Sequence, residues 1–557
     1  MASKLSRRVF LRLAGMGAIG VITAACQPKI VEQEKIVKET VVVEKQVDKI
    51  VKETVVQQVE KAVTPTLDPA MQGELSIDMS YIPGKVTADT PKALYEILRI
   101  AEEYQDAHPG VKIKFEEPFK VSEAMTQANY YLTGAAAGTL PDITFTYQAS
   151  AVYDKGVLLP TTDFLKEPND YIPAGKPGHD RWIDQWFEDT VPKPEADGNT
   201  YSVPLGWGGP GLVIGYNKEM FKKVGITSTP KTYYDLYLAS DEILKSGVIP
   251  CESKLMSWEW DWMVDYLLRA MDIYKLIDVD GNGICTDEEE TRAVVAGIFR
   301  LDCPAWVEPT RIWKAATKYY QPGYLQMLET TTAIGIGEIF MVEQTAMLWN
   351  AGQIWARLMT MCGSAKWGVF NIPRLTKQLT PWAAEDPEWL LERGSGQKTL
   401  TKTCAERKHT RMAVDFLKFV TTPINTARMI EESLGTSLIL PTIKGVDVAV
   451  DEDVKGLLTD FEKPHVPRGF SSDRIGDWHF WYEWWNALQA YLMDTMTLEQ
   501  MIKKQQEVLP QFVDTFVKDR QLESKLKEWQ ALQDQYKTPI WGEYKIPAEP
   551  FVMPFSS

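Results

Sequence analysis

Residues 73–148 contain GELSIDMSYIPG (73–84), TPKALYEILRIAEEYQDAHPG (90–110), VKIKFEEPF (111–119), VSEAMTQANYYLTGAAAG (121–138) and LPDITFTYQ (140–148). The first piece alternates like a strand, and the second is an amphipathic helix that Pro109 and Gly110 stop. The remaining three continue the series as strand, helix and strand. Strands that alternate with helices of this length predict a parallel sheet in an α/β fold.

Two residues at the end of the third predicted strand are candidates for ligand contact. Tyr147 and Gln148 come directly after PDITF. Because ligands of open α/β sheets bind beyond the carboxyl ends of the strands, both side chains belong at a candidate pocket. Taken alone, a polar residue after a strand is more often part of an ordinary loop.

The composition is that of an acidic protein with many aromatic residues. The 557 residues carry a formal net charge of −16, which argues against a nucleic-acid partner because phosphate binding needs clustered Lys and Arg. The chain has 19 Trp and 22 Tyr. Most of them will be core residues, but aromatic faces are also the surfaces on which sugar rings stack.

The sequence lacks the common signatures of catalysis and nucleotide binding. GxSxG, HExxH and P-loop patterns are absent. GWGGPG (206–211) matches the dinucleotide pattern GxGxxG, but such a turn opens a helix, whereas GLVIGY follows here and reads as a strand. These glycines instead suit a hinge at which the backbone comes close to a ligand, with Trp207 projecting there. Taken alone, such a tryptophan is more often a core residue.

The N-terminus has the features of an export signal. Residues 1–25 combine a basic start, a short apolar run and small residues before Cys26. SRRVFL (6–11) resembles a twin-arginine signal, and TAAC (23–26) resembles a bacterial lipobox. We expect cleavage before Cys26, lipidation of its thiol and a tether at the outer face of the cell membrane. The alternative is an ordinary cleaved signal with a coincidental Cys.

Residues 26–72 are predicted to be a stalk. KIVKETVV occurs at 35–42 and again at 49–56, a repeat of two heptads. This spacing permits a short coiled coil, and the alternative is a spacer rich in Val, Lys and Glu. In either case the segment holds the body of the protein away from the membrane.

A series of motifs follows along the body of the chain. They are AEEYQDAHPGVKIKF (101–115), GTLPDITF (138–145), DKGVLLPTTDFL (154–165), DGNTYSVPL (197–205), VIGYNKEMFKKVGITSTPKTYYDL (213–236), QTAMLWNAGQIW (344–355), KWGVFNIPRL (366–375) and AVDFLKFVTTPINTARMIEESLGTSLILPT (413–442). In order and spacing, over about 73–510, they resemble the extracellular solute-binding proteins of ABC importers, a family that includes the maltose-binding protein and many oligosaccharide binders. An enlarged middle at about 250–330 and the long tail after 510 depart from the family pattern.

The resemblance implies an α/β fold of type II, with two lobes that are joined by hinge strands and close on a solute. The globular part is then 73–557. Lobe 1 would comprise about 73–205 and 370–437, and lobe 2 about 210–366 and 440–557. The chain would cross between the lobes near 204–211, 366–374 and 437–442, which are extended stretches punctuated by Pro and Gly.

The resemblance also implies a carbohydrate ligand held by stacked tryptophans. The family's sugar-stacking tryptophan falls on Trp355, with Trp349 as the nearby alternative. A second stacking aromatic falls on Trp484 or Trp485. Trp258 and Trp260 are further candidates, because tryptophans two residues apart cannot share one helical face. The candidate ligand-binding residues are therefore Tyr147, Gln148, Trp207, Trp258, Trp260, Trp355, Trp484 and Trp485.

The resemblance implies a receptor that is not an enzyme and that delivers its solute to ABC permease subunits. A glycoside-acting enzyme is one alternative, since two well-placed carboxylates suffice for glycoside hydrolysis. A surface-anchored carbohydrate-binding or adhesion protein that does not serve transport is another.

The stretch DVDGNGICTDEE (278–289) has the spacing of a calcium-binding EF-hand loop. The expected ligands are Asp278, Asp280, Asn282, Ile284 through its carbonyl, Thr286 and Glu289. Gly283 supplies the sharp turn, and 258–277 and 287–301 are the candidate flanking helices. No second hand follows, so we expect a structural calcium ion rather than a sensor. A polar turn that matches by chance is the alternative.

Overall fold

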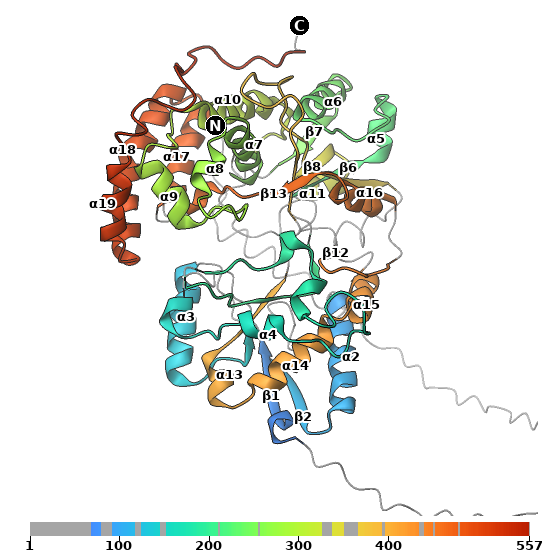
Figure 1. Cartoon of the computed structure of the whole chain (residues 1–557). Helices are drawn as coiled ribbons and strands as arrows, with labels where there is room; N and C mark the ends of the chain where they lie inside the picture. The colour runs from blue at the N-terminus through green and yellow to red at the C-terminus, as the bar shows by residue number, and fades with distance from the viewer. Residues whose placement is uncertain are drawn as a thin grey trace, which may run out of the picture. The chain divides into compact units, whose positions relative to one another are not determined.

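The computed structural model describes residues 68–78, 92–116, 124–144, 152–195, 197–209, 212–253, 257–325, 337–349, 366–392, 396–433, 439–448, 452–476 and 480–555. Residues 66–557 group into one unit. The predictions for the signal peptide, Cys26 and most of the stalk concern residues outside these ranges. Figure 1 labels the helices and strands.

The first lobe is built on a five-stranded sheet in the order β2-β1-β3-β11-β4. Strands β1, β2 and β3 are parallel, and β11 is antiparallel to β3 and to β4. The alternation predicted for 73–148 is confirmed in type and order. The elements are β1 (Gly73–Asp78), α2 (Lys92–Ala107), β2 (Val111–Glu116), α3 (Ala124–Ala137), β3 (Ile143–Thr144), α4 (Thr162–Lys166), β4 (Val203–Pro204), β11 (Gln397–Leu400), α13 (Lys402–Glu406), α14 (Thr410–Val420) and α15 (Pro423–Ser433).

The turn after α2 sets the register of this sheet. The helix ends at Ala107, and Pro109 and Gly110 carry the chain round so that Val111 pairs with Gly73. The apolar face of α2 then lies over the sheet and packs against α14 and α15. The core of lobe 1 includes Leu75, Ile77, Ile97, Ile100, Tyr104, Val414 and Leu417.

The second lobe is built on a four-stranded sheet in the order β7-β8-β6-β9. Strand β6 is antiparallel to both neighbours, and β7 is parallel to β8. The elements are β6 (Val213–Asn217), α5 (Lys218–Lys223), α6 (Tyr233–Lys245), β7 (Ile249–Glu252), α7 (Ser257–Ala270), α8 (Tyr274–Ile277), α9 (Asp287–Val295), α10 (Pro304–Ala316), α11 (Glu338–Met341), β8 (Thr345–Trp349), β9 (Trp367–Asn371), β10 (Trp389–Leu391), α16 (Glu452–Phe461), β13 (His465–Pro467), α17 (Phe480–Leu492), α18 (Leu498–Asp519) and α19 (Glu523–Ala531).

Two short strands pair where the chain crosses between the lobes. Strand β5 (Trp207–Gly208) is antiparallel to β12 (Leu440–Pro441). The first crossing therefore lies between β4 and β6, as the stretch 204–211 predicts. The last crossing falls slightly later than 437–442, because Ile443 still bridges to Trp186 of lobe 1.

The middle crossing was predicted wrongly at 366–374. Strand β9 occupies those residues and pairs with β6 along its whole length, so it belongs to lobe 2. The chain stays in lobe 2 through β10, which pairs with β13, and enters the lobe 1 sheet only at β11. The crossing therefore lies between Leu391 and Gln397, and lobe 1 receives about 396–443 rather than 370–437.

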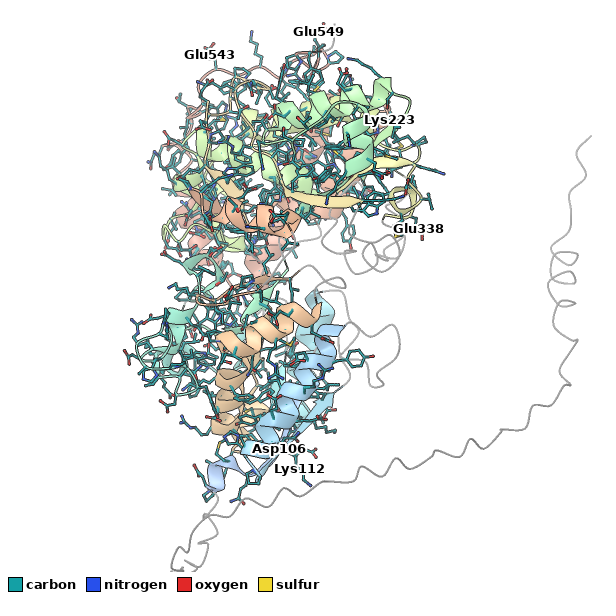
Figure 2. All side chains as sticks on the ribbon, turned by 90° about the vertical axis from the view of Figure 1, so that its right-hand side faces the viewer. Asp106, Lys112, Lys223, Glu338, Glu543 and Glu549 are labelled. Carbon is teal, nitrogen blue, oxygen red and sulfur yellow. The ribbon has the colours of Figure 1, made fainter. Side chains whose placement is uncertain are left out.

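The tail after α19 packs along lobe 2. The Tyr544 hydroxyl donates a 2.6 Å hydrogen bond to Oε1 of Glu308 on α10, and the Arg311 guanidinium donates to the carbonyl of Glu549. Met553 is only 2% exposed and belongs to the lobe 2 core. Figure 2 labels Glu543 and Glu549 on this part of the surface.

Candidate functional site

The carboxyl edge of the lobe 1 sheet gathers polar side chains. Strands β1 and β3 end there at Asp78 and Thr144, and the antiparallel β11 begins there with Lys398 beside them. The Thr144 hydroxyl donates a 3.2 Å hydrogen bond to Oδ2 of Asp78. Oδ1 of Asp78 is buried and accepts no hydrogen bond from the described residues. This oxygen can therefore accept a hydrogen bond from a ligand.

Asp78 and Lys398 form a buried pair of opposite charges. They are 4% and 5% exposed. Burial raises the pKa of Asp78, and the positive charge of Lys398 opposes that shift. Burial also lowers the pKa of Lys398 to about 8, opposed by the charge of Asp78. Each charge thus offsets part of the desolvation cost of the other.

Two tyrosines of α3 stand beside this pair. The Tyr131 hydroxyl lies 3.4 Å from the Thr144 hydroxyl. Burial raises the pKa of Tyr130, and the nearby carboxylates of Asp78 and Glu116 raise it further. The edge thus combines hydrogen-bonding groups with aromatic rings, a combination that suits a polyhydroxylated solute.

The lobe 1 edge was only partly predicted from the sequence. Tyr147 and Gln148 lie outside the described residues, so their place at this edge stays a prediction. Asp78 and Lys398 were missed. The rule that selected Tyr147 also applies to Asp78, which ends β1, whereas Lys398 joins the edge through a strand that is distant in sequence.

Trp207 lies at the interlobe crossing, as predicted. It forms β5 with Gly208, is 8% exposed, and packs in the lobe 1 core. The neighbouring glycine is required by a close approach, because a Cβ on Gly206 would lie 2.0 Å from the hydroxyl of Thr426. The backbone here approaches helix α15, and contact of Trp207 with a solute stays a prediction.

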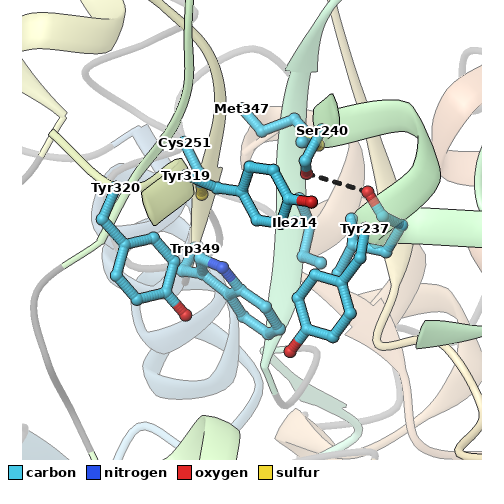
Figure 3. A pocket seen from close by; sticks show the side chains of 9 residues that line it. Ile214, Tyr237, Ser240, Cys251, Tyr319, Tyr320, Met347 and Trp349 are labelled. Carbon is cyan, nitrogen blue, oxygen red and sulfur yellow. Dashed lines mark hydrogen bonds between the residues drawn. The ribbon is translucent and has the colours of Figure 1, made fainter. Parts of the chain in front are cut away.

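The hinge-side edge of the lobe 2 sheet carries Trp349 at the end of β8. Its ring is 5% exposed and stacks on Tyr233 at a centroid distance of 6.5 Å. Behind it lies a small cavity whose walls combine aromatic and aliphatic side chains (Figure 3). It is lined by Ile214, Leu236, Tyr237, Ser240, Cys251, Tyr319, Tyr320, Met347 and Trp349. Burial raises the pKa of the Cys251 thiol, which makes it a poor nucleophile.

The structure places Trp260, Trp484 and Trp485 in the core of lobe 2, so their prediction as ligand contacts was wrong. They are 0%, 1% and 5% exposed. Trp260 packs edge-on against Trp306 at 4.4 Å and lies 5.0 Å from Trp484. Helix α7 is buried on all sides, so residues two apart both face the core. The Trp258 side chain and Trp355 lie outside what the structure describes.

The carboxylates of the 278–289 loop converge. Ligand oxygens of Asp278, Asp280 and Glu289 all lie within 4.8 Å of one another. Ligands on opposite sides of one Ca²⁺ stand about 4.8 Å apart, so these oxygens fit a single ion of that size. Burial raises the pKa of Asp278, and Asp280 and Glu289 raise it further. A cation would relieve this crowding of negative charge.

The rest of the loop also has the geometry that a calcium site needs. Gly283 has φ +85°, the left-handed turn expected at the sixth place. Asn282 Oδ1 accepts a hydrogen bond from the backbone N–H of Ile284. Thr286 caps α9 by accepting from Glu289 N, and it donates to Glu289 Oε2. All six predicted ligands therefore belong to one ordered turn.

The flanking helices are shorter than predicted. The expected helix 258–277 is interrupted after Ala270 and resumes as α8, and α9 stops at Val295 rather than continuing to 301. Asp272 has φ +59°, which ends α7 there.

Among the described residues, no helix combines the length and the apolarity that crossing a membrane requires.

Comparisons with known proteins agree with this architecture. A model of the family described as bacterial extracellular solute-binding protein matches residues 99–459. None of the curated proteins matches the chain. Among solved structures, a chitin oligosaccharide binding protein is similar with a TM-score of 0.56 and 19% identity, over 80% of this chain and 99% of that one.

Two further structures are similar at comparable levels. Maltose-bound MalE3 of T. maritima has a TM-score of 0.52 and 17% identity, over 78% of this chain and 99% of that one. The GacH receptor of Streptomyces glaucescens, solved without ligand and with acarbose, has a TM-score of 0.53 and 16% identity, over 80% and 99%. At these identities the likeness shows the two-lobed fold alone.

Proposed function

Because this chain belongs to the family of bacterial extracellular solute-binding proteins, we propose that it captures an oligosaccharide and delivers it to the permease of an ABC importer. The observation that carries the proposal is the lobe 1 edge, where one carboxylate oxygen of Asp78 accepts no hydrogen bond from the described residues and lies beside Lys398 and two tyrosines. Such groups bind sugar hydroxyls through hydrogen bonds and ring faces through stacking. The three similar structures are those of a chitin oligosaccharide binding protein, a maltose-bound protein and a receptor solved with acarbose, which supports the same ligand class.

Asp78→Asn tests this function. Loss of a charge-assisted hydrogen bond costs about 1.5–3 kcal/mol, so oligosaccharide affinity should fall roughly 10- to 150-fold. Titration calorimetry with chitotriose, maltotriose and acarbose measures it. Asp106→Asn, an exposed carboxylate of α2, is the matched control and should bind like the wild type.

Each alternative function has its own outcome in this experiment. Binding of a peptide but of no oligosaccharide would contradict the ligand class. Release of shortened sugars during the titration would favour the glycoside-acting enzyme. Tight sugar binding in a protein encoded without any permease gene beside it would favour the adhesion protein.

We propose that lipidation of Cys26 tethers the receptor at the outer face of the membrane. The proposal rests on TAAC (23–26) and on SRRVFL (6–11). Cys26→Ala should release the mature protein in soluble form, and replacement of Arg7 and Arg8 by Lys should retain it in the cytoplasm. Cell fractionation with immunoblotting measures both effects. A Cys26→Ala protein that stays in the membrane fraction would contradict the lipid anchor.

We also propose that the 278–289 loop binds one structural calcium ion through Asp278, Asp280, Asn282, Ile284, Thr286 and Glu289. The convergence of the three carboxylates and the left-handed Gly283 support it. The ion would neutralise the carboxylates and fix the end of α8 to the start of α9.

EDTA should lower the melting temperature of the wild type. An ion present at a hundredfold excess over its dissociation constant contributes about 2.7 kcal/mol to the free energy of unfolding. Glu289→Gln should abolish the effect of EDTA on a thermal melt, because it removes the bidentate ligand. Glu288→Gln, one residue earlier and outside the ligand set, should retain it. If EDTA does not change the melting temperature and no calcium is detected in the purified protein, the loop is a polar turn without a metal.

A further inference from the structure

The single EF-hand-like loop has a structural partner elsewhere in the chain. We name residues 467–474 the closing segment. The backbone N–H of Cys285, at the eighth place of the loop, donates a 3.0 Å hydrogen bond to the carbonyl of Gly469. The Arg474 guanidinium donates to the carbonyls of both Cys285 and Gly469, at 2.7 and 2.9 Å. The closing segment therefore pairs with the middle of the loop.

The fit between the two segments is close enough to require glycine. A Cβ on Gly469 would lie 2.6 Å from the carbonyl oxygen of Gly283 and would overlap the Tyr274 hydroxyl. That hydroxyl itself donates a 2.7 Å hydrogen bond to the Gly283 carbonyl. A Cβ on Gly283 would lie 3.4 Å from the ring of Pro467. The turn of the loop is thus packed directly against the closing segment.

Buried carboxylates hold the closing segment from its other side. Asp265 of α7 accepts hydrogen bonds from the backbone N–H groups of Gly469 and Phe470. Glu290 of α9 accepts from Ser471 N, at 3.0 Å. Both carboxylates are fully or almost fully buried. Because these hydrogen bonds are shielded from water, they couple the closing segment to α7 and α9.

The closing segment continues directly from β13, which pairs with the strand that leads to the middle crossing. Strand β13 ends at Pro467 and pairs with β10, with Leu391 opposite Pro467. After β10 the chain crosses to lobe 1 and reaches Gly396, whose N–H donates to the carbonyl of Trp207 and whose carbonyl accepts from Leu205 N. Hydrogen bonds therefore connect the loop with β13 and β10 on one side, and Gly396 with the first crossing on the other.

We propose that metal binding in the 278–289 loop stiffens strand β10, from which the chain leaves lobe 2 at the middle crossing, through the closing segment and β13. The proposal rests on the proposed calcium site and needs no solute. An ion that fixes Asp278 and Glu289 restrains the loop backbone between them, and with it the Cys285 N–H that holds Gly469. This coupling is reciprocal. If the ion stabilises the ordered form of strand β10, the protein binds the ion more tightly when that strand is ordered.

Hydrogen exchange followed by mass spectrometry tests the proposal on the mature protein without solute. Saturating CaCl₂, compared with EDTA, should slow amide exchange in peptides covering 389–392 and 465–471 by about tenfold, because these amides exchange through local opening. Peptides covering β1 should be unchanged and serve as the internal reference. Slower exchange confined to 274–295 would overturn the proposal.

Gly469→Ala separates the loop from the crossing. It leaves every proposed ligand in place but forces the closing segment away from Gly283 and Tyr274. Calcium should still protect 278–290 in this variant and should no longer protect 389–392. Gly456→Ala in α16, where a Cβ meets no atom within 4 Å, is the matched control and should behave like the wild type.

The outcomes distinguish this proposal from the others. Equal protection of 389–392 in Gly469→Ala and in the wild type would overturn the assigned route. Absence of bound calcium by elemental analysis would overturn both the calcium site and the coupling. Failure of every sugar to bind would contradict the carbohydrate assignment and leave the exchange result as it stands.

Discussion

Trp260→Ala will destabilise the protein by about 3–5 kcal/mol, the usual cost of removing a large aromatic side chain from a well-packed core. The side chain is completely buried between Trp306 and Trp484. Its indole N–H also donates a 3.0 Å hydrogen bond to the Thr310 hydroxyl, which would lose this donor and keep only its own bond to the Trp306 carbonyl. Urea denaturation followed by circular dichroism measures the loss.

The matched control for Trp260 is an exposed aromatic residue of the neighbouring helix α17. Tyr482 of α17 is 46% exposed, so Tyr482→Ala should cost less than about 1 kcal/mol. The folded fraction of the Trp260→Ala protein should bind oligosaccharide with the affinity of the wild type. If the Trp260→Ala variant keeps its stability but loses its affinity for sugar, Trp260 contacts the ligand and its assignment to the core is contradicted.

Removal of the tail after Leu532 will destabilise lobe 2 by about 3 kcal/mol or more. Truncation exposes the surface that Met553 covers, which costs about 1.5–3 kcal/mol. It also removes the hydrogen bond from Tyr544 to Glu308, whose carboxylate then keeps Arg311 as its donor, and this loss costs a further ~1 kcal/mol. Differential scanning calorimetry should show a lower melting temperature.

A shorter truncation serves as the control for the tail. Deletion of residues 556–557 leaves Met553 and Tyr544 in place and should not change the melting temperature. Met553→Ala should reproduce part of the loss without shortening the chain. Equal melting temperatures for the long truncation and the full chain would mean that the tail adds nothing to lobe 2.

The alternation of strands and helices at the start of lobe 1 was accessible from the sequence because it is encoded locally. The alternation at 73–148 and the stop signal at Pro109 and Gly110 specify neighbouring elements, and the structure contains them. The middle crossing was not accessible in this way. Pro373 suggests a boundary between structural elements, but β9 pairs with β6, which lies about 150 residues earlier in the chain. No local sequence pattern encodes that pairing.

The prediction that Trp260, Trp484 and Trp485 contact a ligand was wrong for a related reason. A helix with aromatic residues two positions apart predicts an exposed ring only if one of its faces meets water. Helix α7 is covered by α10 and by the tryptophans of α17, so neither Trp260 nor Trp262 is exposed. Burial on all sides is decided by α10 and α17, which the sequence of α7 alone does not reveal.

The position of β11 has a consequence for how the protein is made. It lies between β3 and β4 in the lobe 1 sheet, yet it follows β4 by about 190 residues. At a synthesis rate of about 5–20 residues per second, the gap in that sheet stays open for roughly 10–40 s after β4 emerges. Lobe 1 therefore cannot complete its sheet until most of lobe 2 has left the ribosome. A route that exports the chain only after folding, as SRRVFL predicts, would spare the unfinished sheet from exposure outside the cell.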